Sequence, residues 1–206
     1  QLLIDNAGGK VPEYLQRHHT LFTFGELVGT KDYMVPSHGV SWLPTRQPVV
    51  TDFWKTDGPT LSNARFSSVA NWNTSGRKDV VWRGSNYIWS KSLEFLKFVE
   101  APVRAGEPFE LATEILDEHA HKRFLANRWE FADSRQTSID WHQYRRYLQE
   151  SKGEFTVAKD QYVRLKTGWF SDRSACYLAA GRPVITQETQ FTKFYGGGKG
   201  LIAFET

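Results

Sequence analysis

The strongest constraint on the fold is an alternation of strand-like and helix-like segments that begins near residue 61 and continues to the end of the chain. Short apolar segments at 65–70, 109–112, 154–158, 183–186 and 201–204 predict strands, and segments with helical periodicity at 91–99, 119–131, 141–150 and 171–180 predict helices. Strands that alternate with helices form βαβ units, in which helices cover both faces of a parallel sheet. We therefore predict an α/β fold with a Rossmann-like parallel sheet flanked by helices over residues 61–206.

Residues 1–60 differ from this pattern, because glycine and proline recur through them and only 1–4, 21–24 and 47–50 resemble strands. The turn Trp54–Pro59 predicts a boundary between two parts of the chain. The chain opens and closes on strand-like residues, so we expect a fragment of a longer protein, with the 61–206 domain truncated at its C-terminus. An open sheet edge at that end allows a homodimer by strand pairing.

Composition and charge argue against several classes of protein. The net charge of +3 is small and the basic residues are scattered, which argues against nucleic-acid binding. No apolar run reaches the roughly 18–20 residues of a transmembrane helix. The single cysteine, Cys176, allows no internal disulfide and favours a cytoplasmic protein. The histidines lack metal-site spacing and no GxGxxG sequence occurs, so we expect no metal and no dinucleotide cofactor.

The segment Gly168–Pro183, GWFSDRSACYLAAGRP, predicts a loop, a helix and the start of a strand. Ser171 is a residue type favoured at helix N-caps, and Asp172 suits the positive end of the helix dipole. With Arg173 and Ser174, this helix start offers two hydroxyls, a guanidinium and free N–H groups, which together suit a phosphate. On spacing alone, an ordinary capped helix is the favoured explanation of Ser171 and Asp172, because such caps are the norm.

Two other strand ends carry polar residues that could meet a ligand, because ligands bind at the carboxyl ends of strands in open α/β sheets. The loop 71–84 contains Arg77 and Lys78, which could reach a phosphate. Gln187, Glu188 and Thr189 follow the strand at 183–186, where a carboxylate could hold sugar hydroxyls. A solvated loop and a surface turn are the alternatives at these two places.

Residues 151–187, SKGEFTVAKDQYVRLKTGWFSDRSACYLAAGRPVITQ, resemble the C-terminal domain of glycosyltransferases with the GT-B fold, and especially a bacterial branch of them. Further segments fit the same branch, namely Phe22–Glu26, Trp42–Val49, Asn71–Trp72 and Gly200–Leu201. The resemblance covers most of residues 20–206, and the block Gly168–Val184 is its most specific part.

The resemblance implies two Rossmann-like domains with the active site between them and a C-terminal domain that binds a nucleotide-sugar donor without a metal. Residues 1–60 would then be a remnant of the N-terminal acceptor domain and a linker. The donor diphosphate would meet the helix start, with Gly168, Trp169 and Ser171 matching the Gly-Trp-x-Ser pattern of plant-type members. Its contacts would be Gly168, Trp169, Phe170, Ser171, Asp172, Arg173 and Ser174, assisted by Arg77 and Lys78.

The chain departs from retaining members of this family at two positions. The glutamate that grips the donor ribose would fall at Cys176, and a second glutamate would fall at Gly168. Ribose or sugar binding is therefore expected from other residues, with Glu154, Gln187, Glu188 and Thr189 as candidates and Asp172 as a further one. No residue here matches the catalytic base of inverting relatives, so the fragment need not be active.

The sequence thus predicts a glycosyltransferase fragment that transfers a glycosyl group from a nucleotide-diphosphate sugar to an unknown acceptor. One alternative is a non-catalytic carbohydrate- or protein-binding α/β module that uses the aromatic residues of 1–60. Another is an α/β enzyme that uses a dinucleotide, against which the missing glycine fingerprint argues.

Overall fold

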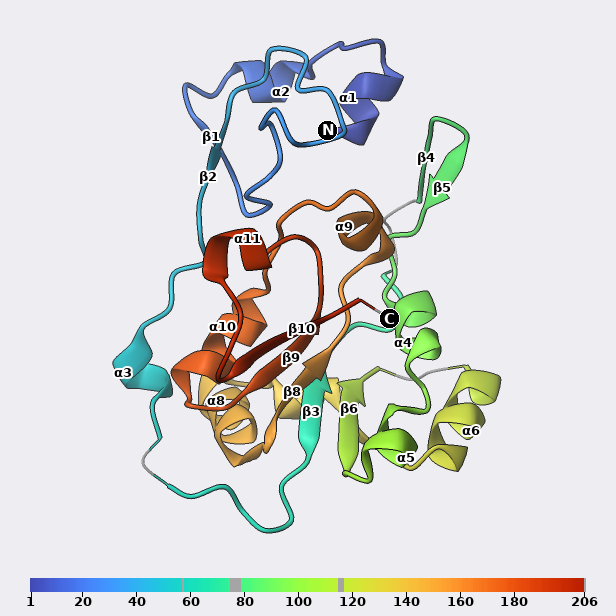
Figure 1. The fold of residues 1–206 in the computed structure, drawn as a ribbon, viewed down its shortest axis with the longest axis vertical. Coiled ribbons are helices and arrows are strands. Elements are labelled where there is room, and N and C mark those ends of the chain that lie inside the picture. The colour runs from blue at the N-terminus through green and yellow to red at the C-terminus, as the bar shows by residue number, and fades with distance from the viewer. Residues whose placement is uncertain (57, 75–78, 115–116, 206) are drawn as a thin grey trace.

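The computed structural model describes residues 1–56, 58–74, 79–114 and 117–205 (Figure 1). Its centre is a six-stranded parallel sheet in the order β10-β9-β8-β3-β6-β7. The strands are β3 Phe66–Val69, β6 Phe109–Thr113, β7 Trp129–Asp133, β8 Gly153–Thr156, β9 Val184–Gln187 and β10 Leu201–Phe204. Counted along the chain, this is the 3-2-1-4-5-6 order of Rossmann-like sheets. The α/β, Rossmann-like prediction is confirmed.

Helices flank this sheet, and two hydrophobic clusters hold them in place (Figure 1). The helices are α4 Ser92–Lys97, α5 Ala101–Ala105, α6 Glu118–Ala126, α7 Ser134–Thr137, α8 Trp141–Glu150, α9 Asp160–Arg164, α10 Asp172–Ala179 and α11 Thr192–Tyr195. Phe95 of α4 and Phe124 of α6 pack in one cluster with residues of β6 and β8. Leu148 of α8 and Tyr177 of α10 form the other with Val184.

The predicted helix at 119–131 is wrong in its second half. The helix α6 ends at Ala126, and Arg128 adopts a left-handed backbone with φ of 64°, which an α-helix cannot continue through. The chain then turns into β7, where Trp129 is almost fully buried and its indole N–H donates to the carbonyl of Val99 at 2.7 Å. The aromatic residues at 129 and 131 therefore fill the sheet side of the core.

Most of residues 1–56 form short elements above the edge where the sheet strands end (Figure 1). These are α1 Leu2–Asn6, α2 Glu13–Gln16 and a parallel pair, β1 Leu21–Thr23 and β2 Trp42–Pro44. The helix α3 Thr51–Trp54 lies beside α10 instead (Figure 1). The prediction of a strand at 21–24 is confirmed. Those at 1–4 and 47–50 are wrong, because 2–6 is helical and 47–50 makes no strand pairing.

Several contacts anchor this N-terminal segment to the rest of the chain, among them the two described here. The Leu27 N–H donates to the carbonyl of Thr167 at 3.0 Å, and Gly25 forms a β-bridge with Trp169. The helix α1 packs against a hairpin made of β4 Val80–Trp82 and β5 Ser85–Tyr87, where Asn6 donates to the carbonyl of Val81. The segment therefore covers the loops at the carboxyl edge of the sheet.

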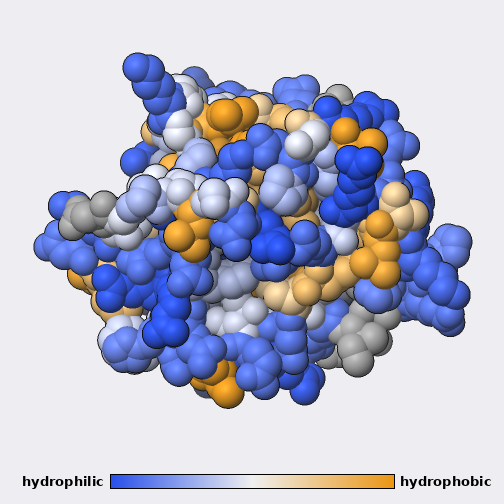
Figure 2. Space-filling model, turned by 90° about the horizontal axis from the view of Figure 1, so that it is seen from below, coloured by the Kyte–Doolittle hydropathy of each residue, from blue (hydrophilic) through white to orange (hydrophobic). Residues whose placement is uncertain are grey.

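The face opposite the N-terminal segment is mostly hydrophilic, with hydrophobic residues in small separate patches (Figure 2). Within the described ranges, no helix has both the length and the apolar character needed to cross a membrane.

Candidate functional site

A pocket of about 550 Å³ lies at the carboxyl ends of β3 and β8. These two strands are neighbours in the sheet, and the chain order reverses between them, so the pocket occupies the topological switch point. In open α/β sheets this is the position at which ligands bind. We call it the switch-point pocket; it is lined by Val69, Ala70, Asn71, Thr74, Trp89, Lys91, Lys159, Tyr162, Trp169, Ser171, Asp172 and Arg173.

Lys91 is the most unusual residue of the switch-point pocket. Only 8% of it is exposed, yet its ammonium makes no hydrogen bond or ion pair with any residue that the structure describes. Burial, and next the nearby Arg173, lower the pKa of Lys91 well below its ordinary value. A buried cation without a partner is costly, so the pocket favours an anion that would supply one.

Lys159 brings a second cation to the same pocket. It lies three residues after the end of β8, and its Nζ lies 3.9 Å from the centroid of the Trp89 ring and 5.9 Å from that of Tyr162. Both contacts are within the range of cation–π attraction. The lysine is therefore held at the mouth of the pocket by the aromatic side chains around it.

Three aromatic rings form one wall of the pocket. The Tyr162 and Trp169 ring centroids are 4.8 Å apart, and those of Trp89 and Tyr162 are 6.4 Å apart. Rings held in this way offer flat apolar surface to a base or a sugar while the lysines offer charge.

The start of α10 forms the opposite wall. Ser171 occupies the N-cap position, but its hydroxyl does not cap the helix and instead lies 3.4 Å from Asp172 Oδ1. The first N–H groups of this eight-residue helix therefore lack a side-chain cap. Free N–H groups at a helix N-terminus bind anions. The structure thus brings Ser171 and Asp172 together with Lys91 and Lys159.

The sequence predicts that the guanidinium of Arg173 faces a ligand, but in the structure it is hydrogen-bonded to protein groups. Its Nε donates to Glu154 Oε1 at 2.5 Å, and its terminal nitrogens donate to the Val69 carbonyl and the Thr156 hydroxyl. The Glu154 side chain is fully buried in β8 and does not line the pocket. Arg173 therefore lines the pocket with its hydrogen bonds already made to protein groups, and together with Glu154 it ties α10 to β3 and β8.

The loop before α10 is held by contacts to the loop after β9. Gly168 N–H donates to the Thr189 carbonyl at 2.7 Å, and the Thr189 hydroxyl donates to the Trp169 carbonyl at 2.6 Å. Gly168 has φ of 72°, and a Cβ there would lie 3.0 Å from the Leu27 nitrogen, so glycine permits the close approach of the N-terminal segment. Gly168 and Thr189 therefore position Trp169 without lining the pocket themselves.

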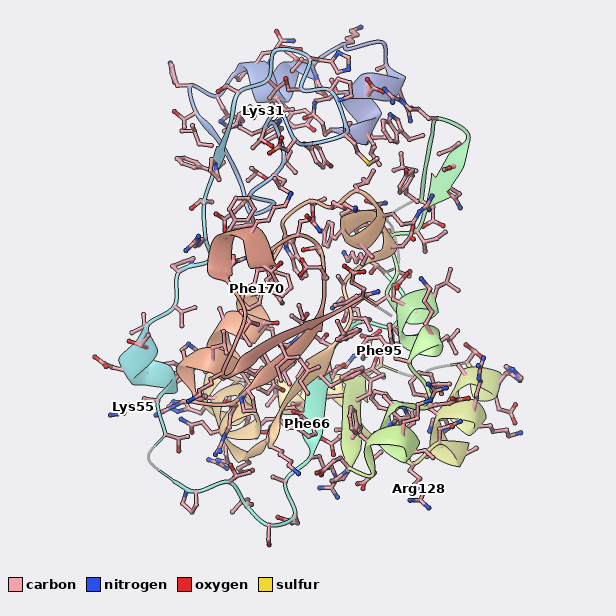
Figure 3. The ribbon with its side chains drawn as sticks, viewed as in Figure 1. Lys31, Lys55, Phe66, Phe95, Arg128 and Phe170 are labelled. Carbon is pink, nitrogen blue, oxygen red and sulfur yellow. The ribbon has the colours of Figure 1, made fainter. Side chains whose placement is uncertain are left out.

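Two further residues of this block are structural in their placement. Phe170 is buried against Phe191 and Tyr195, with ring centroids 5.2 and 4.8 Å away, beside α11 (Figure 3). Ser174 is fully buried in α10, and its hydroxyl has no partner among the residues that the structure describes. Neither residue lines the pocket.

Gln187 links the segment after β8 to α4, the helix for which Lys91 is the N-cap residue. Its amide nitrogen donates to Glu94 Oε2 at 2.8 Å, and its oxygen accepts from the Ala158 N–H at 3.1 Å. Glu94 is itself buried and lies one turn after Lys91 in α4. Glu188 bonds through its N–H to the Phe204 carbonyl and, like Gln187, does not line the pocket.

The remaining predicted residues include two that cannot be placed. Arg77 and Lys78 lie outside the described residues.

Cys176 is half-buried in α10, and burial raises the pKa of its thiol to about 11, which keeps it neutral. Within the described ranges, no group of three or more His, Cys, Asp or Glu side chains could hold a metal ion.

Sequence reasoning missed Lys91, Trp89, Lys159 and Tyr162. Lys159 had a usable signal, because it directly follows a predicted strand at the edge where ligands bind. Lys91 had none, because the serines on either side of it give it the appearance of an exposed helix start.

Comparison with protein-family models and with curated proteins finds no match to this chain.

Proposed function

We propose that the switch-point pocket binds the diphosphate of a nucleotide sugar, and that the chain is the donor-binding part of a GT-B-type glycosyltransferase. The observation that carries this proposal is the buried, unpartnered ammonium of Lys91 in a pocket at the sheet's switch point. Glu154 and Asp172 lie near enough to favour the charged form of Lys91, and a diphosphate would add the direct hydrogen-bonded counter-charge that Lys91 lacks among the described residues. The resemblance of the Gly168–Val184 block to glycosyltransferase donor sites supports the same ligand.

The arrangement suits the two halves of such a donor. Lys91, Lys159 and the uncapped N-terminus of α10 would face the phosphates, and the wall of Trp89, Tyr162 and Trp169 would pack against an aromatic base or a sugar ring. Asp172, Asn71 and Thr74 line the pocket and offer hydrogen bonds to hydroxyl groups.

The chemistry that these residues assist is departure of the diphosphate. The bond between the anomeric carbon and the diphosphate oxygen breaks, and the diphosphate keeps the electron pair. The acceptor oxygen forms the new bond to that carbon, and its proton is released to water. Cations fixed at the leaving group stabilise the charge that develops on it. No residue is assigned as a catalytic base.

Isothermal calorimetry of the full chain with UDP and GDP tests the proposal. Lys91→Met keeps the length of the side chain and removes the charge, and we expect it to weaken nucleotide binding by about 10- to 100-fold, the loss of a charge-assisted contact of roughly 1.5–3 kcal/mol. Lys122→Met is the matched control, because Lys122 is exposed on α6, pairs with Glu118 and does not line the pocket. Equal affinity of Lys91→Met and the native chain would place the nucleotide elsewhere.

Pyrophosphate, methyl glucoside and NAD separate the proposal from its alternatives. We expect pyrophosphate to compete with UDP or GDP, because the phosphates make the charged contacts. Binding of methyl glucoside without any nucleotide binding would instead favour a carbohydrate-binding module. Tight binding of NAD alone would favour a dinucleotide enzyme.

A further inference from the structure

The buried side-chain amide of Gln187 joins two segments that are far apart in the sequence. Gln187 ends β9 and is only 2% exposed. Its nitrogen donates to Glu94 Oε2 in α4 at 2.8 Å, and its oxygen accepts the N–H of Ala158, between β8 and α9, at 3.1 Å. Both ends of the amide are therefore used inside the protein, and the residue does not line the switch-point pocket.

Each of the two joined segments carries a lysine of the pocket. Lys91 is the N-cap residue of α4, three residues before Glu94, and Lys159 directly follows Ala158. Burial most of all, and then the positive charges of Arg173 and Lys159, lower the pKa of Lys91. The two lysines therefore lie near enough to repel each other, so the ligand-free protein needs other contacts to keep their segments together.

The start of α4 has little local support of its own. The helix has six residues, and Lys91 provides no side-chain cap at its N-terminus. Such a short helix depends on tertiary contacts. Phe95 anchors its apolar face in the core, while Glu94 accepts hydrogen bonds from Lys97 within the helix and from Gln187. Within the described ranges, Gln187 is the one residue outside α4 that hydrogen-bonds to the Glu94 side chain.

We propose that Gln187 is a positioning residue of the switch-point pocket: by holding α4 against the segment after β8, it keeps Lys91 and Lys159 facing the same ligand. The lysines then meet the ligand already in place, and its negative charge does not have to draw the two segments together against their repulsion. This inference rests on the proposed function for the identity of that ligand, whereas the position of Lys91 can be measured without one.

The first measurement uses the ligand-free full chain. NMR titration of ¹³C-lysine-labelled protein gives the pKa of Lys91, whose signal is assigned by its loss in Lys91→Met. Gln187→Met nearly keeps the length of the side chain and removes both hydrogen bonds. We expect the pKa of Lys91 to rise toward its ordinary value, because α4 can then move toward water and away from the other lysine. The substitution leaves in place the charged groups that act on Lys91, namely Arg173, Glu154, Lys159 and Asp172.

A swap of the two partners separates positioning from a general loss of stability. Gln187→Glu alone sets a second carboxylate against that of Glu94, which pushes α4 away. With Glu94→Gln added, the new amide donates to the new carboxylate, which still accepts the Ala158 N–H, and the amide oxygen accepts from Lys97. We expect the swap to restore the low pKa of Lys91 and to return the affinity for nucleotide to within about twofold of the native value.

Calorimetry with UDP, GDP and pyrophosphate measures the effect on ligand binding. Gln187→Met should raise the Kd about 3- to 30-fold, in the range of coupling between residues that share partners. In the Lys91→Met background the same change should lose most of its effect, because no ammonium is left there to be placed. Gln149→Met is the matched control: the Gln149 amide donates to the Trp54 carbonyl at 2.8 Å, away from the pocket's lining, so affinity should stay native.

The outcomes separate this inference from the proposed function. An unchanged pKa of Lys91 in folded Gln187→Met, or an equal loss of affinity with and without Lys91, would overturn the positioning role. If Gln187→Met does not fold, the swap decides, and values as altered as in Gln187→Glu alone would overturn it too. A native chain that binds none of the three ligands, yet whose Lys91 pKa changes in Gln187→Glu and recovers in the swap, overturns the donor site and leaves the positioning role standing.

Discussion

Two pockets lie at the same carboxyl edge of the sheet and differ in whether their charged side chains form ion pairs. The pocket at the ends of β6 and β7 is the larger, at about 740 Å³ against 550 Å³ for the switch-point pocket. Its charges are already paired: Glu114 with Arg135 at 3.1 Å, and Glu118 with Lys122 at 2.5 Å. The carboxylate of Asp133 accepts a hydrogen bond from the backbone N–H of Arg135.

The switch-point pocket instead keeps the ammonium of Lys91 buried and unpaired among the described residues. Unsatisfied charge at the chain-reversal position therefore favours the switch-point pocket as the candidate ligand site, although the other pocket is larger. An ion pair exposed to water contributes little free energy, so its charges are already well solvated without a ligand. A buried charge without a partner is costly, so a ligand of opposite charge would relieve a larger free-energy penalty.

The largest effect should come from the ion pair beneath the switch-point pocket. Glu154→Ala leaves Arg173 buried without its counter-charge, and breaking a buried pair in this way costs about 3–5 kcal/mol. Urea denaturation would measure the free energy of unfolding. Glu130→Ala removes the exposed partner of Arg65 and serves as the control. A loss as small as that of the control would mean that water reaches the Glu154 carboxylate.

Lys91→Met should act in the opposite direction on stability. Burial of the Lys91 ammonium carries a desolvation cost in the folded protein. Replacing it with an apolar side chain of similar length should therefore leave the free energy of unfolding unchanged or raise it by about 1–4 kcal/mol. Thermal unfolding without ligand gives the change. A clear loss of stability would show that Lys91 has a protein partner, and the contrast between the two pockets would fail.

Nucleotide binding should depend on pH through the same lysine. Burial lowers the pKa of Lys91 in the free protein, and a bound phosphate would favour the charged form and raise that pKa again. Affinity should therefore fall as pH rises between the two pKa values, by at most about tenfold per pH unit, with one proton taken up on binding. Calorimetry in buffers of different ionisation enthalpy measures this uptake, and Lys91→Met should abolish it.

The smallest effect is expected at the β6–β7 pocket. Arg135→Ala breaks an ion pair whose side chains are 79% and 55% exposed, so the free energy of unfolding should change by no more than about 1 kcal/mol. Affinity for UDP and GDP should be unchanged. A loss of nucleotide binding in this variant would move the donor site along the sheet edge toward β7.

Much of the sheet could be predicted from sequence, because strands and helices with clear periodicity form where their apolar faces require burial. The segments at 109–112, 141–150 and 201–204 are confirmed as β6, α8 and β10. The strand β7 was missed because the helix before it ends at Ala126 and the chain turns at Arg128, a residue type that rarely takes a left-handed backbone. Nothing in the local composition marks that turn.

The candidate site was only partly within reach of sequence. Ser171 and Asp172 line the pocket, as expected for a helix start that follows a loop. Arg173 belongs to the same helix start, but its Nε–H donates a hydrogen bond to Glu154, which lies nineteen residues earlier in the chain. Charge pairing between distant segments is decided by packing, and no spacing rule reports it.

The amino-acid sequence by itself determined the alternation of strands and helices over most of residues 61–206, the loop and helix at Gly168–Ala179, and the absence of an internal disulfide. The tertiary structure alone decided which cation is satisfied and which is not. Arg173 reaches a buried carboxylate, and Lys91 reaches none among the described residues. The reason is physical: the energy of a charge depends on its solvation and its neighbours, and both are set when remote parts of the chain pack together.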